Sequence, residues 1–448
     1  MSDTMPISRA EQEIERLLGI YPRGFDLSLD RIARLLDDLG RPQDRMPPII
    51  HIAGTNGKGS ATAFSRALIE AAGLSAHVHT SPHLVRWHER YRIGVPGGSG
   101  RLVSDDKLLD AVLRAEKANA GQAITVFELL TAVIFILFSE HPADAAIIEV
   151  GLGGEFDATN VIANPAVSLI MPVALDHQTW LGNTITDIAK AKAGIIKKGR
   201  PVVIGRQDEQ AALDLLTETA YRANSPTQTY GQDYLAFEEN GRLVYQDQDG
   251  LMDLPLPALL GRHQYSNAAA AIRAVKSAGF KLTEEIVATA MKSVSWPARL
   301  QRLKSGDLIP FAPIGAEVWL DGGHNPHGGR AVAEAMAAFE ERDSRPLYLI
   351  TGMINTKDPK GYFEAFHGLA RKVYTVAIRN SDAGLDPVVL ANDAAEAGLD
   401  ARPASSAAAA LSEISADIGE NETPPRILIG GSLYFAGNIL EENGTLPE

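Results

Sequence analysis

The chain has 448 residues, of which 45% are hydrophobic and 22% charged, and it contains no cysteine. This length predicts two or three domains, because domains commonly have about 100–200 residues. Without cysteine, no disulfide or thiolate metal site can form. The formal net charge is −14 and long basic tracts are missing, which argues against sequence-independent binding of nucleic acid. We therefore expect small-molecule partners.

The N-terminal segment is acidic and amphipathic, and it lacks the apolar core of a signal peptide. The most apolar run, residues 129–138, is about half as long as a bilayer span needs, so it predicts a buried helix. These features lead us to expect a cytoplasmic monomer without membrane association.

The first part of the chain alternates buried strands with helices. This alternation is typical of a doubly wound, mainly parallel α/β sheet. Two short apolar runs around Asn240-Gly241 interrupt it and predict a hairpin. The Gly-rich segment 94–103 is expected to be a mobile loop. Strands are predicted at 48–54, 75–81, 145–151, 166–173 and 201–205, and helices at 58–72, 127–141, 184–196, 267–278 and 284–293.

A second alternation follows, with strands predicted at 317–323, 346–353, 372–378 and 426–432, and an Ala-rich helix within 403–417. We predict an α/β protein with two domains. Residues 1–296 are expected to form a doubly wound domain, which the Gly-rich turn at residues 54–60 makes P-loop-type, and residues 297–448 a smaller Rossmann-like domain.

The strongest local signal is the turn GTNGKGS, residues 54–60, between a buried strand and a helix. Its glycines let backbone N–H groups face a phosphate, and the helix N-terminus adds positive charge. Lys58 can reach the phosphates. The turn departs from the standard phosphate loop, because Gly59 follows Lys58 where Ser or Thr normally supplies a hydroxyl to Mg²⁺. The metal ligand must be Ser60 or a hydroxyl from another segment.

Polar groups follow three further predicted strands, within residues 80–84, 149–154 and 175–177. Open α/β sheets bind ligands at such strand ends. Glu149 lies on an inner strand, where a carboxylate needs a cation or a basic partner. His177 by itself fits a packed or capping histidine equally well. The spacing of Lys190, Lys192, Lys197 and Lys198 favours a solvated basic face. The turn 321–327 is either a ligand site or a simple tight turn.

Together these segments resemble the folylpolyglutamate synthase/dihydrofolate synthase family of the Mur ligase superfamily. The matching strings occur in family order: HIAGTNGKGS, TSPHLVRWHER, EVGLGGEFDATNV, LDHQTWLGNTITDIAKAKAGI, NAAAA, ARLQ and LDGGHNPHG. The resemblance implies an ATP-dependent ligase that phosphorylates the carboxylate of a pteroate or folate and joins it to the amine of L-glutamate. Such chemistry needs positioning and charge neutralisation more than covalent protein chemistry.

The resemblance also implies roles for individual residues. The ATP phosphates would be held by Asn56, Gly57, Lys58, Gly59 and Ser60. Further nucleotide contacts would come from Asn267, from Arg299 in the linker and from Asp321. A pair of Mg²⁺ ions would be held by Ser81, Glu149 and His177, with a monovalent cation as a further cofactor. Lys192 matches a lysine that the family carbamylates, and the expected catalytic residues are Lys58, Lys192 and His324.

For the pterin substrate, the resemblance implies contacts from three segments. The residues are Arg23, Phe25, Asp26, Phe127, Glu128, Phe156, Asp157 and Ala158. Two positions depart from the family pattern. Glu155 stands where a basic residue is usual, and Ala298 stands where Gly is more usual.

Four functions remain open at this stage. The favoured one is a bifunctional dihydrofolate synthase and folylpolyglutamate synthase, which the segment PRGFDLSLDRI, residues 22–32, mildly supports. The second is polyglutamylation alone. The third, a cell-wall precursor ligase, is disfavoured by the strings DATNV and TSPHL. The fourth, a nucleotide-binding regulatory protein, is disfavoured because Lys58, Glu149, His177 and Lys192 are all retained.

Overall fold

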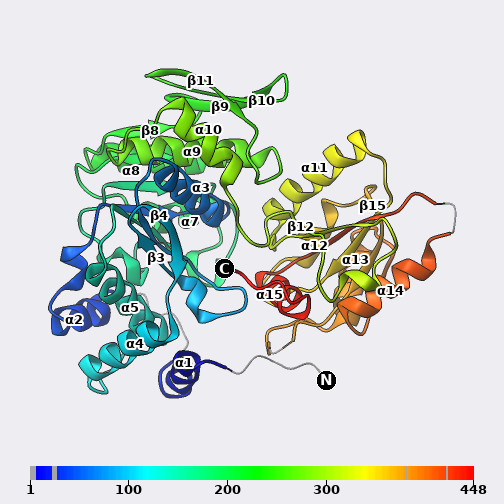
Figure 1. The fold of residues 1–448 in the computed structure, drawn as a ribbon, viewed down its shortest axis with the longest axis horizontal. Helices are drawn as coiled ribbons and strands as arrows, with labels where there is room; N and C mark the ends of the chain where they lie inside the picture. The colour runs from blue at the N-terminus through cyan, green and yellow to red at the C-terminus, as the bar shows by residue number, and fades with distance from the viewer. Residues whose placement is uncertain (1–6, 23–27, 380, 420–421) are drawn as a thin grey trace. The chain divides into compact units, whose positions relative to one another are not determined.

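The structure is a computed structural model that describes residues 7–22, 28–379, 381–419 and 422–448. The chain divides into two compact units (Figure 1). Unit 1 consists of Met1–Leu256, Ser266–Val294 and Glu448, and unit 2 of Pro257–Tyr265 and Ser295–Pro447. The main division, between residues 294 and 295, lies close to the expected boundary after residue 296.

Within its described residues, unit 1 contains an eight-stranded sheet in the order β4-β3-β2-β5-β1-β6-β7-β8. The six strands β2, β5, β1, β6, β7 and β8 are parallel to one another, whereas β3 and β4 add antiparallel strands at the edge beside β2. The strands are β1 Ile49–Ala53, β2 Ala76–His79, β3 Tyr91–Val95, β4 Gly98–Leu102, β5 Ala145–Glu149, β6 Val167–Ile170, β7 Val202–Ile204 and β8 Thr227–Thr229.

The inner strands are buried along their whole length, as expected for parallel strands that helices cover on both faces. The helices of unit 1 are α1 Arg9–Ile20, α2 Asp30–Asp38, η1 Pro42–Arg45, α3 Lys58–Ala71, η2 Trp87–Arg90, α4 Asp105–Asn119, α5 Val126–Glu140, η3 Ala158–Val161, α6 Gln178–Leu181, α7 Ile185–Ala193, α8 Gln210–Arg222, α9 His263–Ser277, of which the first three residues belong to unit 2, and α10 Glu284–Ser293.

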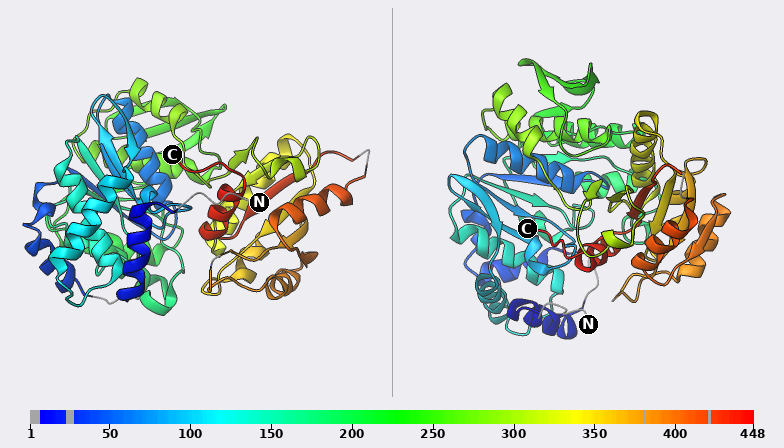
Figure 2. Two further views of the ribbon diagram at one scale, coloured as in Figure 1. Left: turned by 60° about the horizontal axis from the view of Figure 1, so that its bottom comes forward. Right: turned by 45° about the vertical axis from the view of Figure 1, so that its right-hand side comes forward.

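Helix α5 forms the centre of one core layer. Every residue from 129 to 138 is buried, which confirms the predicted buried helix. Its apolar side chains share a core with α1, α2, α4 and the sheet. Figure 2 shows α1 lying along α4, and α3 packs against α10. Described helices therefore cover both faces of the strands that carry the predicted ligands.

The predicted hairpin at Asn240-Gly241 is confirmed. Its strands β9 Tyr234–Glu239 and β10 Arg242–Asp247 pair antiparallel, and β11 Gly250–Pro255, which was not predicted, adds a third strand. Asn240 and Gly241 have φ values of 52° and 74°, the left-handed conformation that tight hairpin turns require. This small sheet contacts α10 (Figure 1).

The segment 94–103, expected to be a loop, is mostly strand. Most of this segment forms the hairpin of β3 and β4. The Gly100 N–H donates to Glu70 Oε1 at 3.0 Å, which fixes β4 to α3. Glycine content alone therefore did not distinguish a loop from an edge hairpin.

Unit 2 has a six-stranded sheet in its described residues, ordered β12-β13-β17-β14-β15-β16 and parallel except for β12. The core lies between this sheet and α11, α12 and α13. The elements are β12 Gln301–Leu303, η4 Ile309–Phe311, β13 Glu317–Leu320, α11 Pro326–Arg342, β14 Leu347–Thr351, α12 Pro359–Glu364, β15 Ala370–Thr375, α13 Pro387–Glu396, β16 Ala401–Pro403, α14 Ala407–Asp417, β17 Arg426–Gly430 and α15 Leu433–Glu442.

The predicted fold class is confirmed. Each predicted strand is present and ends earlier than predicted; β15 also begins two residues before its predicted start, and the short strands β8, β12 and β16 are additional. No helix in the described ranges combines the length and the apolar character needed to cross a membrane.

Candidate active site

The Gly-rich turn between β1 and α3 has the geometry of a phosphate site. The first helical hydrogen bond runs from Ala61 N to Gly57 O at 2.8 Å. The N–H groups of Lys58, Gly59 and Ser60 therefore precede the helical ladder, where an anion can accept from them. Lys58 Nζ donates to its own loop, to Gly54 O at 3.0 Å and Thr55 O at 3.3 Å.

Two other segments fix this turn in place. Thr55 N donates to Pro172 O at 2.8 Å, and Thr55 Oγ1 donates to Ala174 O at 3.0 Å, which fastens the turn to the segment after β6. Gly57 has a φ of 80°, and a Cβ there would lie 2.8 Å from Asn267 Oδ1. The structure thus places Asn267, on α9, beside the phosphate turn.

The predicted metal ligands follow β2, β5 and β6 at the same edge of the sheet, where β2 and β5 are neighbours and β1 lies between β5 and β6. Glu149 ends β5 and is 5% exposed. His79, at the end of β2, pairs with Ile148, so Ser81 continues past the strand beside the end of β5. His177 begins α6 after β6, and its side chain is 44% exposed. Parallel strands bring their carboxyl ends to one edge, where ligands bind.

These residue types fit a hard divalent cation. Ser81 Oγ is buried and has no hydrogen-bond partner in the described part of the chain. A buried hydroxyl without a partner is costly, and a cation at this position would satisfy it. Glu149 adds a carboxylate, the ligand type that Mg²⁺ prefers. His177 is a less usual ligand for Mg²⁺, but the buried carboxylate of Asp176 lies beside it.

Lys192 lies on α7, and its side chain is buried rather than solvated, being 4% exposed. The expectation of a solvated basic face is therefore wrong at this position. Burial, together with repulsion from Lys58, lowers the pKa of Lys192 to about 7, although Asp176 and Asp157 act in the opposite direction. The structure thus brings Lys192 within electrostatic range of the phosphate turn. Sequence reasoning did not single out Asp176, although it adjoins His177.

Asp157, predicted as a substrate contact, is 4% exposed and organises the GLGG turn after β5. Its Oδ2 accepts from Gly151 N and Leu152 N, both at 3.0 Å. Its Oδ1 accepts from Thr159 N at 3.0 Å and Thr159 Oγ1 at 2.5 Å. Burial raises the pKa of Asp157, and these hydrogen bonds oppose that rise. Both carboxylate oxygens of Asp157 therefore accept hydrogen bonds from nearby backbone N–H groups.

A buried histidine extends this network into β1. His51 Nε2 lies 2.9 Å from Thr159 Oγ1. Because that hydroxyl donates to Asp157, His51 must donate from Nε2. Burial, together with repulsion from Lys197, lowers the pKa of His51 to about 3, so the ring is neutral. Sequence reasoning did not identify this connection, because its members are more than one hundred residues apart.

Helix α5 presents Phe127 in its first turn, and the neighbouring Glu128 holds that turn. Glu128 accepts from Thr125 N at 2.8 Å and forms a two-point ion pair with Arg31, at 3.0 and 3.1 Å. A Cβ on Gly151 would lie 2.6 Å from the Phe127 ring, so only glycine lets the ring approach the turn. Phe127 therefore lies over the GLGG turn.

The remaining residues that are predicted to contact the pterin differ in their exposure to solvent. Ala158 is buried in η3, whereas Phe156 is 44% exposed and the Glu155 side chain is also exposed. Arg23, Phe25 and Asp26 lie outside the described residues.

In unit 2, Asp321 follows β13 and joins two segments. Its Oδ2 accepts from Leu300 N at 2.9 Å, and its Oδ1 accepts from Gly323 N at 2.7 Å. Burial raises the pKa of Asp321, and the nearby Arg299 opposes the rise. His324 Nδ1 donates to Gly322 O at 2.9 Å. Arg299, Asp321 and His324 thus cluster at the carboxyl end of β13.

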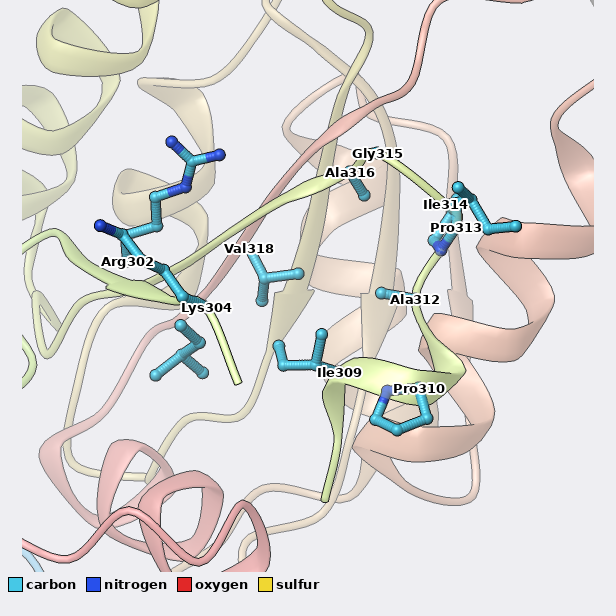
Figure 3. A pocket seen from close by; sticks show the side chains of 11 residues that line it. Arg302, Lys304, Ile309, Pro310, Ala312, Pro313, Ile314, Gly315, Ala316 and Val318 are labelled. Atoms are coloured by element: carbon cyan, nitrogen blue, oxygen red, sulfur yellow. The ribbon is translucent and has the colours of Figure 1, made fainter. Parts of the chain in front are cut away.

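A cavity elsewhere in unit 2 contains none of the predicted site residues. It lies beside η4 and the start of β13 (Figure 3) and is lined by Arg302, Leu303, Lys304, Ile309, Pro310, Ala312, Pro313, Ile314, Gly315, Ala316 and Val318.

The phosphate turn, the oxygen donors at adjacent strand ends and the buried lysine define an ATP-dependent ligase of the Mur type. Residues 52–275, half of the chain, match the family model of the Mur ligase middle domain. The chain is 35% identical to folylpolyglutamate synthase of Lacticaseibacillus casei over 91% of this chain and 92% of that protein. It is 36% identical to dihydrofolate synthase/folylpolyglutamate synthase of Mycobacterium tuberculosis over 83% and 78% of the two chains.

A solved structure agrees with these relatives. It is bifunctional folylpolyglutamate synthase/dihydrofolate synthase from Yersinia pestis complexed with AMPPNP and Mn ion, which has a TM-score of 0.82 and 26% sequence identity, covering 96% of this chain and 97% of that one. The chain belongs to the folylpolyglutamate synthase/dihydrofolate synthase family. It is an ATP-dependent ligase of folate metabolism.

Proposed function

We propose that this ligase joins L-glutamate to the carboxylate of dihydropteroate and also to reduced folates, with release of ADP and phosphate. The observation that carries the proposal is the buried Lys192, which lies within electrostatic range of Lys58 and whose backbone packs against Gly154, in the turn that follows Glu149. The names of the relatives from M. tuberculosis and Y. pestis support the bifunctional form.

The reaction proceeds through an acyl phosphate. An oxygen of the acceptor carboxylate attacks the γ-phosphorus of ATP, and ADP leaves. The amine of glutamate then attacks the acyl carbon, phosphate leaves, and the nitrogen gives up its proton to form the amide. Lys58 Nζ, which donates to the backbone carbonyls of Gly54 and Thr55 in its own loop, turns to the phosphates and offsets their charge.

Ser81, Glu149 and His177 hold the divalent metal, which we take to be a pair of Mg²⁺ ions. When bound, Mg²⁺ neutralises charge on the transferring phosphoryl group. Lys192 carries a carbamate, because an amine with a pKa near 7 is partly neutral at physiological pH and can react with carbon dioxide. The carbamate replaces a buried cation by an anion. A monovalent cation is a further cofactor.

The other predicted residues keep the roles that the family resemblance implies. Asn267, Arg299 and Asp321 contact the nucleotide, and His324 acts near it. Phe127 offers an aromatic face to the pterin ring, supported by its position over Gly151. Phe156 adds exposed apolar surface. Asp157 and Ala158 bound the same turn, and Arg23, Phe25, Asp26 and Glu128 complete the substrate segments.

Polyglutamylation alone is the second candidate, because the L. casei relative is named only as folylpolyglutamate synthase and covers 91% of this chain. In either case we infer a cytoplasmic monomer whose partners are small molecules, not nucleic acid or membrane.

The test is glutamate-dependent phosphate release in the presence of ATP and Mg²⁺, measured separately with dihydropteroate and with a reduced folate. The proposal predicts release with both acceptors, and its loss in Lys58→Ala. Release with the reduced folate alone would select the second candidate. No release with either acceptor would refute the folate assignment.

A further inference from the structure

Glu89 organises the segment that carries Ser81. It lies in η2, and its Oε2 accepts from Leu84 N at 2.8 Å. Its Oε1 accepts from Val85 N at 2.9 Å and Arg86 N at 2.7 Å. One carboxylate thus receives three consecutive backbone N–H groups, and charge-assisted bonds of this kind are stronger than neutral ones.

A second set of contacts closes the same segment. Arg90 Nε donates to His83 Nδ1 at 2.9 Å, and the guanidinium lies 4.4 Å from the Trp87 ring centroid. The His83 and Trp87 rings are also 4.4 Å apart. At the start of the segment, His79 Nδ1 donates to Arg90 O at 2.8 Å. Backbone and side chains therefore tie residues 83–86 to η2 and to the end of β2.

The segment is also anchored to the helices of its core layer. Trp87 N donates to Glu11 Oε1 at 3.3 Å, and His88 Nε2 lies 3.3 Å from Asp105 Oδ1. Glu11 is on α1 and Asp105 begins α4, so η2 has a rigid support. Only Pro82 and His83 separate Ser81 from Leu84, the first backbone group that Glu89 holds.

Ser81 needs such support because its own hydroxyl holds nothing in place. Its Oγ is buried and makes no hydrogen bond to any described residue. A metal ligand must be held within a fraction of an ångström by the groups around it. Both oxygens of Glu89 are occupied by backbone N–H groups, so its carboxylate acts on the backbone and not on the metal.

We propose that Glu89 is a positioning residue that sets the Ser81 hydroxyl for metal binding, with the Arg90–His83–Trp87 stack as its support. The inference rests on the proposed metal role of Ser81 and extends it to a residue whose carboxylate accepts from the backbone of residues 84–86. Glu89→Gln tests it, because the amide group would place a donor against a backbone N–H while keeping the size of the side chain.

The first measurement is the Mn²⁺ affinity of protein loaded with AMPPNP, determined from the EPR signal of free Mn²⁺. The second is the Mg²⁺ concentration that gives half-maximal activity. Outer partners of metal ligands typically change metal affinity by about 10–100-fold. We expect Glu89→Gln to weaken Mn²⁺ binding by about tenfold or more. Glu140→Gln, on exposed α5 surface, is the matched control and should leave it unchanged.

A double-mutant cycle with Ser81→Ala separates the two claims. If Glu89 acts through Ser81, the double variant binds Mn²⁺ no more weakly than Ser81→Ala alone. Unchanged Mn²⁺ affinity in Ser81→Ala would refute the proposed metal site itself. Two results would overturn the role of Glu89 but leave the metal site standing. One is weaker Mn²⁺ binding in Ser81→Ala with normal binding in Glu89→Gln, and the other is additive effects in the double variant. Glu89→Asp, which keeps the charge on a shorter side chain, should weaken Mn²⁺ binding less than Glu89→Gln does. If Glu89→Gln folds poorly, Glu89→Asp replaces it, and an Mn²⁺ affinity equal to that of the wild type would overturn the inference.

Discussion

The buried amine of Lys192 lies within electrostatic range of Lys58. Burial and a nearby positive charge both disfavour the ammonium form of Lys192. Lys192→Ala should lower kcat by about 100-fold, the upper range for loss of a group that supports a metal site. Acetate or propionate should partly restore activity by supplying the missing anion. The measurement is the rate of phosphate release at rising carboxylate concentration, with Lys190→Ala, exposed on the same helix, as control. Full activity of Lys192→Ala would exclude the carbamate.

Ala298 has a φ of 53°, in the left-handed region that costs an L-residue about 1 kcal/mol or more. This explains why glycine is more usual here. Ala298→Gly relieves the strain but gives the unfolded chain more freedom, so we expect a net gain of about 0.5 kcal/mol in the free energy of unfolding. The comparison is Ala337→Gly within α11, which should lose about 1 kcal/mol because glycine weakens a helix interior. Calorimetric midpoints of the two variants should move in opposite directions.

At the residue scale, the motifs predicted the segments of the site but not the hydrogen bonds that each side chain makes. Asp157 and Glu128 were expected to contact substrate, yet their carboxylates accept hydrogen bonds from backbone groups and, for Glu128, from Arg31. No single sequence tells whether a motif carboxylate faces a ligand or its own turn. The hydrogen-bond partners of Glu89 could not be predicted from the sequence either, because they are backbone N–H groups.

The small sheet of β9, β10 and β11 depends on a buried carboxylate at the β10–β11 turn. Asp247 Oδ2 accepts from Lys276 Nζ at 2.6 Å, Tyr245 Oη at 2.8 Å and Arg273 Nη1 at 3.2 Å. Burial by itself would raise the pKa of Asp247, but the bonds from Lys276 and Tyr245 hold it below its usual value. Its stabilising effect is therefore complete above the unfolded pKa, about 4, and is lost as the pH falls through the folded value.

We expect Asp247→Asn to destabilise this region by about 3 kcal/mol at pH 7, since it leaves Lys276 and Arg273 without their buried partner. Faster amide hydrogen exchange in β10 and α9 is the measurement. Asp253→Asn, in an exposed pair with Arg242, should change exchange little. The difference between wild type and Asp247→Asn should shrink toward pH 3. Equal exchange in both variants at pH 7 would contradict this account.

Elements were predictable where the pattern was strong. The buried strands, α5 and the hairpin at Asn240-Gly241 follow from apolar runs and turn chemistry. The hairpin of β3 and β4 was missed because its stabilising contacts, such as Gly100 N to Glu70, join residues far apart in sequence. Short edge strands such as β12 and β16 have too few residues for a period to be read.

For the whole molecule, the order of motifs predicted the family and the α/β architecture, because each motif follows a buried strand. The sequence could not predict which groups meet. The electrostatic coupling of Lys58 and Lys192 joins residues more than one hundred positions apart, and it arises because β1 and β6 are neighbours and α7 follows β6.

The central claim is that an acyl phosphate links ATP cleavage to amide formation, and one isotope measurement tests it directly. Dihydropteroate labelled with ¹⁸O in its carboxylate is turned over with ATP, Mg²⁺ and L-glutamate, and the released phosphate is analysed by mass spectrometry. The account predicts one ¹⁸O atom in each phosphate, since the carboxylate oxygen that attacks the γ-phosphorus leaves with it. Unlabelled phosphate released alongside the amide product would contradict it.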